Sequence, residues 1–304
     1  MLWFGTNRGI NKLNPYKGKF QLYTNDKANL NSLSDDIIKS VFQDSKGNIW
    51  IGTYNGGLNK FNIKENKFFS YKNNINNPNS ISDNTIWAIK EDKNGILWIG
   101  TSYGLNKFDP ATNKFEVFKK DLLGKSGLRN NNISSLYFDS KGYLWIGTWG
   151  GGLSIYDVKS DNFYNYFYEK SNSKSLSSDQ IKFIYEDSRS NIWIGTLGGG
   201  LNKVNRKEIS DYSNIKFKHV FSGSAESKSL SSNSLTSVCE EGDYLYFGTY
   251  GGGINRTLVN STNNGKEIKF ERFLAEHGLA GNTIYGILSD NNGSLWISTN
   301  NGIS

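Results

Sequence analysis

Three glycine clusters in this sequence could bind a phosphate. They are "TWGGGL", "TLGGGL" and "TYGGGI", at residues 148–153, 196–201 and 249–254. A phosphate loop places its glycines between a strand and a helix, so that the helix N-terminus meets the anion. Here an apolar–polar alternation, which is typical of strands, stands on both sides of each cluster. Because glycine also supplies the positive φ of tight hairpin turns, we interpret the clusters as β-turns.

Each glycine cluster belongs to a phrase that recurs along the whole chain. Its aromatic anchors are Trp3, Trp50, Trp98, Trp145, Trp193, Tyr246 and Trp296, spaced 47 to 53 residues apart. A period in this range is typical of a repeat architecture. The length alone would suggest about two domains, but the repeat predicts a single propeller domain over residues 1–304.

Each repeat carries four strand patterns and no helical pattern of useful length. In the second repeat they lie at residues 37–44, 49–54, 58–62 and 67–72. This repetition predicts an all-β fold, a β-propeller of six to seven four-stranded antiparallel blades. The first copy lacks a first strand, and the last lacks most of a third strand and all of a fourth, so we expect incomplete terminal blades and imperfect closure. The second strands are expected near residues 2–6, 49–53, 97–101, 144–148, 192–196, 245–249 and 295–299.

A carboxylate repeats with the same period. An aspartate stands six residues before a tryptophan in five copies, at Asp44, Asp92, Asp139, Asp187 and Asp290. Repeated carboxylates could suggest calcium, but there is one aspartate per turn, usually with a glycine two or three residues later. Such a side chain is better explained as the cap of its own turn. We therefore predict no metal site.

The other reactive side chains are isolated. His219 and His277 lack metal-ligand spacing, and no Ser–His–Asp arrangement can be argued from the sequence. Cys239 occupies a strand position that Phe42 and Tyr137 take in other repeats, so we interpret it as a packed residue. We predict no catalytic residue and no cofactor.

Composition limits the classes of partner. The net charge of +7 is carried by lysines scattered through the loops. This favours either a solvated surface or attraction to an acidic partner such as an anionic polysaccharide. Nucleic acid is disfavoured because no basic stripe with interleaved aromatics is present. The sequence contains no membrane span and no visible signal peptide, and since it begins and ends inside repeats, we expect a fragment of a larger protein.

The unit "SLSDDIIKSVFQDSKGNIWIGTYNGGLNKFN" at residues 32–62 resembles the two-component regulator propeller repeat. Its pattern is S-L-S-x-N/D-x-I, a D-x-x-G turn, then L/I-W-I-G-T-x-x-G-G-L, and it returns at Ser80, Ser175 and Ser229 and more loosely at Asn130 and Gly281. The resemblance implies a periplasmic or extracellular propeller of a membrane receptor. Further propeller, β-sandwich and signalling domains would follow, ending in a histidine kinase, a kinase–regulator hybrid or a diguanylate cyclase. Many such proteins are similar to sensors of oligosaccharides.

One face of the predicted blades is the best candidate surface for a ligand. In a meander, the turns between second and third strands lie on the same face as the connections between blades. Aromatic rings there suit sugar C–H faces, and arginines suit carboxylate or sulfate. The alternative is that the aromatics only pack between blades. The candidate ligand-binding residues are Tyr54, Trp149, Tyr250, Arg8, Arg129, Asp83, Asp179 and Asn233.

Three classes of function remain open at this stage. The first is a ligand-sensing or scaffold propeller of an extracytoplasmic receptor, with an oligosaccharide as ligand and an acidic one favoured. The second is a propeller enzyme, similar to a polysaccharide lyase or a glycosidase. The third is a protein-interaction propeller. Because catalysis needs one blade to differ in a functional way, the regularity of the repeats favours a protein that is not an enzyme.

Overall fold

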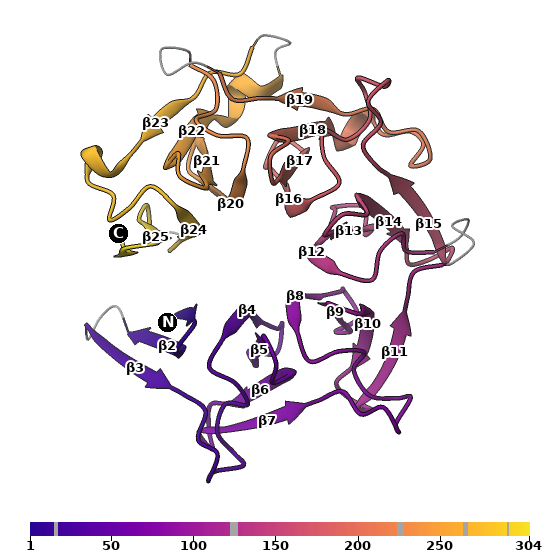
Figure 1. Cartoon of the computed structure of the whole chain (residues 1–304), viewed down its shortest axis with the longest axis vertical. Helices are drawn as coiled ribbons and strands as arrows, with labels where there is room; N and C mark the ends of the chain where they lie inside the picture. Colours follow the sequence, from indigo (N-terminus) through magenta and orange to yellow (C-terminus); the bar gives the residue numbers. More distant parts are fainter. Residues whose placement is uncertain (15–17, 122–126, 224–227, 264–266, 291) are drawn as a thin grey trace. The chain divides into compact units, whose positions relative to one another are not determined.

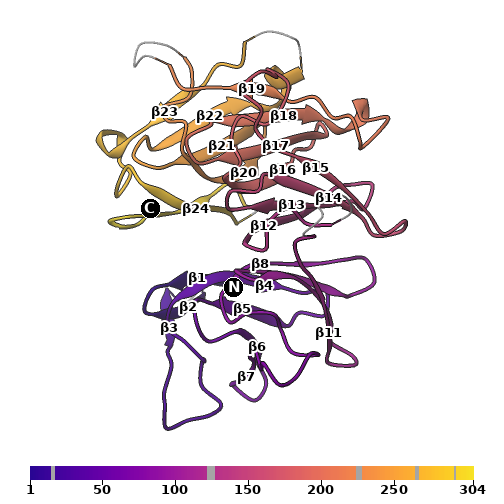
Figure 2. The ribbon, with the colours of Figure 1, turned by 45° about the vertical axis from the view of Figure 1, so that its right-hand side comes forward.

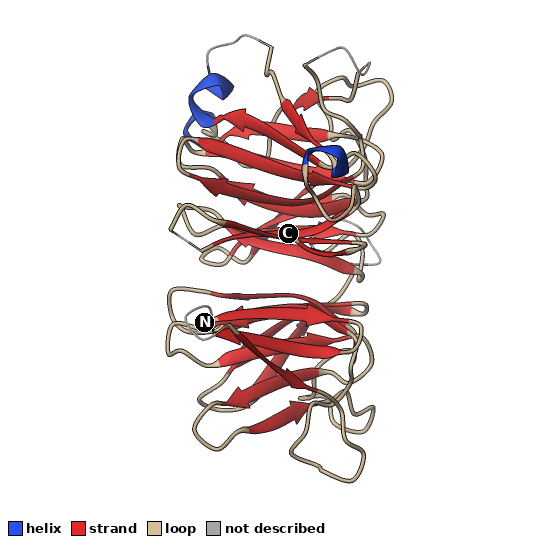
Figure 3. Ribbon diagram, turned by 90° about the vertical axis from the view of Figure 1, so that its left-hand side faces the viewer, coloured by secondary structure: helices blue, strands red, loops and turns tan. Residues whose placement is uncertain are grey.

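The computed structural model of the chain describes residues 1–14, 18–121, 127–223, 228–263, 267–290 and 292–304. Over these ranges the chain forms seven antiparallel sheets of consecutive strands, with three short 3-10 helices between strands (Figures 1 and 3). Five sheets have four strands, and the first and last have three. The fold is a seven-bladed β-propeller with incomplete terminal blades, which confirms the fold class predicted from the sequence.

The first three blades are β1 (Leu2–Thr6) to β3 (Lys19–Tyr23), β4 (Ile38–Gln43) to β7 (Lys67–Tyr71), and β8 (Ile86–Glu91) to β11 (Lys114–Phe118). Their middle strands are β2 (Gly9–Asn14), β5 (Ile49–Thr53), β6 (Leu58–Asn62), β9 (Leu97–Thr101) and β10 (Gly104–Asp109). Blade 4 comprises β12 (Ile133–Phe138), β13 (Leu144–Thr148), β14 (Leu153–Asp157) and β15 (Asn162–Tyr166).

Blade 5 comprises β16 (Ile181–Glu186), β17 (Asn191–Thr196), β18 (Leu201–Asn205) and β19 (Lys218–Val220). Blade 6 comprises β20 (Leu235–Glu241), β21 (Tyr244–Thr249), β22 (Ile254–Leu258) and β23 (Glu271–Phe273), and blade 7 comprises β24 (Ile284–Ser289), β25 (Leu295–Thr299) and β26 (Gly302–Ile303). The 3-10 helices are η1 (Arg206–Glu208), η2 (Val259–Asn263) and η3 (Ala275–His277). The chain divides into two compact units, Met1–Phe138 and Asp139–Ser304, each described by itself below.

Each internal blade is buried on both faces. Figure 2 shows β4 to β7 of blade 2 side by side, as their strand order requires. Successive side chains of a strand point to opposite faces, so Trp50 packs with Phe108 of blade 3, whereas Ile49 and Ile51 pack with Ile10 of blade 1. A single repeat therefore has no complete core, and neighbouring blades stabilise one another.

The repeated aspartates cap their own turns, as the sequence indicates. Asp44 accepts the N–H groups of Lys46 (3.0 Å) and Asn48 (2.7 Å) and the indole Nε1–H of Trp50 (2.8 Å). Burial alone would raise the pKa of Asp44, but these hydrogen bonds outweigh it and lower the pKa. Corresponding aspartate–indole bonds join Asp92 to Trp98, Asp139 to Trp145 and Asp187 to Trp193.

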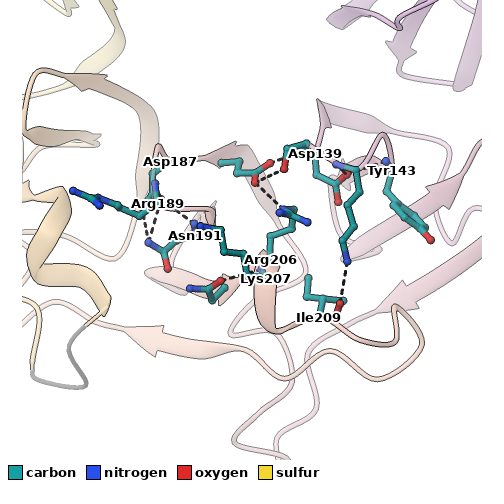
Figure 4. Close-up of polar contacts among 12 residues, drawn as sticks. Asp139, Tyr143, Asp187, Arg189, Asn191, Arg206, Lys207 and Ile209 are labelled. Carbon is teal, nitrogen blue, oxygen red and sulfur yellow. Dashed lines mark hydrogen bonds and ion pairs between the residues drawn. The ribbon is translucent and has the colours of Figure 1, made fainter.

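A long connection between β18 and β19 packs against blade 4 in the second unit (Figure 4). Lys141 Nζ donates to the backbone oxygen of Ile209 (3.2 Å). Tyr212 stacks on Tyr143, with the ring centroids 3.7 Å apart. At the start of the connection, Arg206 forms an ion pair with Glu186 (3.0 Å). The connection is thus a structural brace between two blades.

Candidate functional site

The turn between the second and third strands meets the segment that leads into a first strand. Tyr54 donates its N–H to Ile37 O (2.9 Å), and Tyr250 donates its N–H to Ser234 O in the same way (2.9 Å). We call the surface formed by these elements the turn face. In the first unit it comprises residues 7–9, 33–39, 54–57, 81–87, 102–104 and 128–134, and in the second unit it comprises residues 149–152, 176–182, 197–200, 230–236, 250–253, 279–285 and 300–302.

The glycine clusters on the turn face are hairpin turns, not phosphate loops. Gly152 has a φ of +77°, and a Cβ there would lie 2.3 Å from Tyr166 O. Gly200 has a φ of +71°, and its Cβ would lie 2.4 Å from Val220 O. Only glycine allows the turn to approach the fourth strand this closely.

Two of the predicted site residues tie a loop to a neighbouring turn. Asp179 Oδ1 accepts the N–H of Tyr168 (2.7 Å), and its backbone oxygen accepts those of Gly150 (3.0 Å) and Gly152 (3.1 Å). Asn233 repeats this pattern with Ser222 (2.7 Å) and Gly200 (2.8 Å) as donors. The residues at this position whose side chains also cap a loop N–H are Asp36, Asn84, Asn131 and Asn282. Asp179 and Asn233 therefore stabilise the connections between the loops and the glycine turns.

Asp83 also holds its own turn. Its Oδ1 accepts the N–H of Thr85 (2.7 Å), and the Thr85 hydroxyl donates to the backbone oxygen of Tyr54. Asp83 is thereby linked to the turn that carries Tyr54. The two predicted arginines also lie in turn-face segments of the first unit: Arg8 is exposed in the turn between β1 and β2, and Arg129 is half-buried just before β12.

An aromatic corner with a lysine lies on the turn face of the first unit. Tyr54 is 41% exposed, and its ring meets that of Trp87 edge-on, with centroids 6.3 Å apart and an interplanar angle of 77°. The Lys39 ammonium lies 5.1 Å from the Tyr54 centroid and 5.4 Å from that of Trp87. The Trp87 indole donates to Ser102 Oγ (2.9 Å), which fixes the ring. We call these three residues the Lys39 corner.

The Lys39 corner carries an exposed positive charge. In the part of the chain that the structure describes, Lys39 forms no ion pair. The nearby Asp35 is engaged with backbone, because its two oxygens accept the N–H groups of Ile37 (3.0 Å) and Asn55 (2.7 Å). An anion could therefore approach the Lys39 ammonium without displacing a carboxylate.

The second unit uses the same repeat positions. Trp149 is half-buried, and the Lys182 ammonium lies 5.5 Å from its ring centroid. Tyr250 is 63% exposed, and Tyr285, on β24, is 57% exposed. Lys182 and Tyr285 are both the second residue of a first strand, as Trp87 and Lys39 are.

Sequence reasoning found one of these two positions and missed the other. Tyr54, Trp149 and Tyr250 follow a Gly–Thr pair and were among the candidates. Trp87 and Lys39 were not, because the candidates were taken from the turns and connections and not from the first residues of the strands that follow them. For Trp87 the available signal was a tryptophan at a position where the other repeats have Lys39, Ser134, Lys182, Thr236 and Tyr285.

The remaining reactive groups serve local structure. His219 Nε2 lies 2.7 Å from Ser175 O, and His277 Nδ1 accepts the N–H of Leu274 (3.1 Å). Burial raises the pKa of the Cys239 thiol, which disfavours a nucleophilic thiolate. Among the described residues, no group of three His, Cys, Asp or Glu side chains could hold a metal ion. In the described ranges, no helix is both long and apolar enough to cross a membrane.

Five segments of the chain match the family model for the two component regulator propeller. They are residues 32–55, 80–103, 127–150, 175–198 and 278–301. The chain is therefore a β-propeller that contains two-component regulator propeller repeats. This confirms the resemblance seen in its sequence motifs. No curated protein matches the chain.

Solved structures with the same fold include extracellular domains of bacterial proteins. The extracellular domain of the hybrid two component system BT3049 from B. thetaiotaomicron is 24% identical, with a TM-score of 0.77 over 99% of this chain and 37% of that chain. The extracellular domain of the one component system BT4673 from the same organism is 20% identical, with a TM-score of 0.54 over 99% and 51%. PorZ, a surface component of the type-IX secretion system of Porphyromonas gingivalis, is 19% identical, with a TM-score of 0.66 over 90% and 39%. The chain thus spans 37 to 51% of the length of the first two, and at these identities the likeness concerns the fold.

Proposed function

We propose that the chain is a ligand-binding, non-catalytic propeller domain, residues 1–304, on the periplasmic or extracellular side of a two-component-type receptor. The regulator repeats and the likeness to extracellular domains of such systems support this assignment. Because the chain spans only part of those structures, further propeller, β-sandwich and signalling domains of the same protein are its proposed partners. A histidine kinase or a diguanylate cyclase would be the output.

The proposed ligand is an oligosaccharide, with acidic glycans favoured by the net charge of +7. The observation that carries this proposal is the exposure of aromatic rings at two repeat positions of the turn face, with lysines beside them. Exposed rings can stack on sugar C–H faces, and lysines attract carboxylate or sulfate. Turn-capping aspartates and locally bonded histidines favour binding rather than catalysis.

The test is an oligosaccharide array probed with the wild-type chain, followed by mass spectrometry of the bound glycans. We expect binding of at least one glycan in the micromolar range or weaker, without cleavage. Reproducible cleavage that is lost in Asp83→Asn, Asp179→Asn or His277→Ala would replace the sensor proposal with the enzyme. Binding of no glycan would contradict the ligand assignment.

A further inference from the structure

We propose that the Lys39 corner is a subsite for the carboxylate or sulfate group of an acidic sugar. This inference rests on the proposed function, because it takes the ligand to be an oligosaccharide, and it specifies where the acidic group binds. The residues that carry it are Lys39, Tyr54 and Trp87, of which only Tyr54 was a candidate from the sequence.

The two rings position the lysine. A lysine ammonium within about 6 Å of an aromatic centroid is attracted to the ring. Lys39 satisfies this criterion for two rings at once, at 5.1 and 5.4 Å. An exposed lysine normally loses rotamer entropy when a ligand fixes it. A lysine already held against two rings loses less, so the charge is preorganised for an anion.

The supporting contacts fix the corner to the rigid part of the blade. Trp87 is held by its indole bond to Ser102 Oγ (2.9 Å). Tyr54 is held at its backbone by Ile37 O (2.9 Å) and by the Thr85 hydroxyl. Because both rings come from elements tied into blades 2 and 3, the ammonium has a defined place on the turn face.

The Lys39 ammonium is also not paired with a carboxylate among the described residues. Both oxygens of Asp35 are occupied by backbone donors. A bound carboxylate or sulfate would therefore gain a charge-assisted hydrogen bond without breaking an existing one. A neutral sugar would gain no comparable interaction from Lys39.

The matched control is a second exposed lysine of the same unit. The Lys119 ammonium lies 4.5 Å from the centroid of Tyr103, which is 52% exposed. Lys119 thus has the same kind of contact with one ring, outside the corner. Lys119→Gln removes one surface charge, as Lys39→Gln does, and leaves the corner intact.

The experiment measures acid selectivity with paired glycans. Oligosaccharides of polygalacturonate, alginate, hyaluronan and heparin are compared with their carboxyl-reduced or desulfated counterparts. We expect the wild-type chain to bind the acidic member of at least one pair about tenfold more tightly or better. Lys39→Gln should abolish this ratio and leave the affinity for the neutral member unchanged, whereas Lys39→Arg and Lys119→Gln should keep the ratio.

The outcomes separate this inference from the proposed function. An acid preference that Lys39→Gln leaves unchanged would overturn the subsite alone, as would equal binding of acidic and neutral members. Binding of no member of any pair would overturn both. Sodium sulfate, titrated at constant ionic strength, identifies the source of the anion: if it saturates the corner as tightly as the best glycan, the sugar part of the inference is wrong.

Discussion

The hydroxyl of Tyr212 donates to Asp139 Oδ2 over 2.7 Å, although 73 residues separate them in the sequence. The same carboxylate oxygen accepts the indole N–H of Trp145 (3.0 Å). The long connection of blade 5 thereby completes the turn of blade 4. This contact makes the connection part of the fold of the second unit rather than a free loop.

Tyr212→Phe should lower the free energy of unfolding by about 1.5–3 kcal/mol, because it removes a hydrogen bond to a charged group. Urea unfolding of the chain measures the change. Tyr103→Phe is the control: its ring is 52% exposed, and we expect a change within about 0.5 kcal/mol. Equal stability of Tyr212→Phe and wild type would show that the connection does not brace blade 4.

Alkaline pH should destabilise the chain through the same contact. Burial, and then the Asp139 carboxylate, raise the pKa of Tyr212 well above its ordinary value, and burial raises the pKa of Tyr166 to about 12. In the unfolded chain both titrate near 10. Their contribution is therefore fully present below about pH 10 and is lost as the pH rises toward the folded pKa values. Urea midpoints between about pH 9 and 11 should fall less steeply for Tyr212→Phe, and parallel slopes would contradict this assignment.

Lys203→Met should stabilise the chain at neutral pH. Lys203 is buried on β18, and burial lowers its pKa to about 8, with Asp187 opposing the shift. Below that pH the folded state holds a buried charge, so replacing it should add about 1–3 kcal/mol. The gain should shrink from about pH 8 to the unfolded pKa near 10, because the folded lysine then becomes neutral.

The control for Lys203→Met is Lys107→Met. Lys107 occupies the same repeat position in blade 3, but its side chain is 40% exposed and pairs with Glu116 (3.1 Å). Its stability change should stay within about 0.5 kcal/mol at every pH. If the stability gain of Lys203→Met does not depend on pH, it comes from packing rather than from removal of the buried charge.

A comparison of Gly152→Ala with Gly142→Ala separates the cost of a left-handed backbone from the cost of a clash with the neighbouring strand. Both glycines have positive φ, +77° and +89°, but a Cβ at 152 would lie 2.3 Å from Tyr166 O, whereas nothing lies within 4 Å at 142. Gly142→Ala should cost about 1–2 kcal/mol for the left-handed conformation. Gly152→Ala should cost clearly more, because the turn must also move away from β15. Equal thermal shifts would mean that the turn adjusts freely.

The repeats predicted the blades because each second strand can be recognised from its own motif. An aromatic anchor such as Trp50, flanked by isoleucines and followed by Gly–Thr, predicts a strand that is buried on both faces, and its recurrence every 47 to 53 residues predicts a propeller. The aspartate six residues earlier was also interpretable, since Asp44 and Trp50 are close in the sequence.

The candidate site was less predictable because it depends on contacts between repeats. Asp179 looked like a ligand-binding carboxylate, and only the fold shows that it caps Tyr168 and receives two glycine N–H groups. Lys39 and Trp87 lie 48 residues apart in the sequence. The contact between the Lys39 ammonium and the Trp87 ring depends on the packing of adjacent blades. Tyr212 and Asp139 are a third such pair.

The most direct test of the ligand-binding turn face is calorimetry on Trp149→Ala, with the tightest-binding glycan of the array as ligand. Trp149 is half-buried beside Lys182, whereas Trp145 is fully buried. Trp145→Ala, the control, should cost about 3–5 kcal/mol of stability, as truncation of a core aromatic does. We predict that Trp149→Ala weakens glycan binding about tenfold or more, which corresponds to about 1.4 kcal/mol, and melts close to the wild type. A Trp149→Ala protein that is strongly destabilised and binds with unchanged affinity would contradict the account.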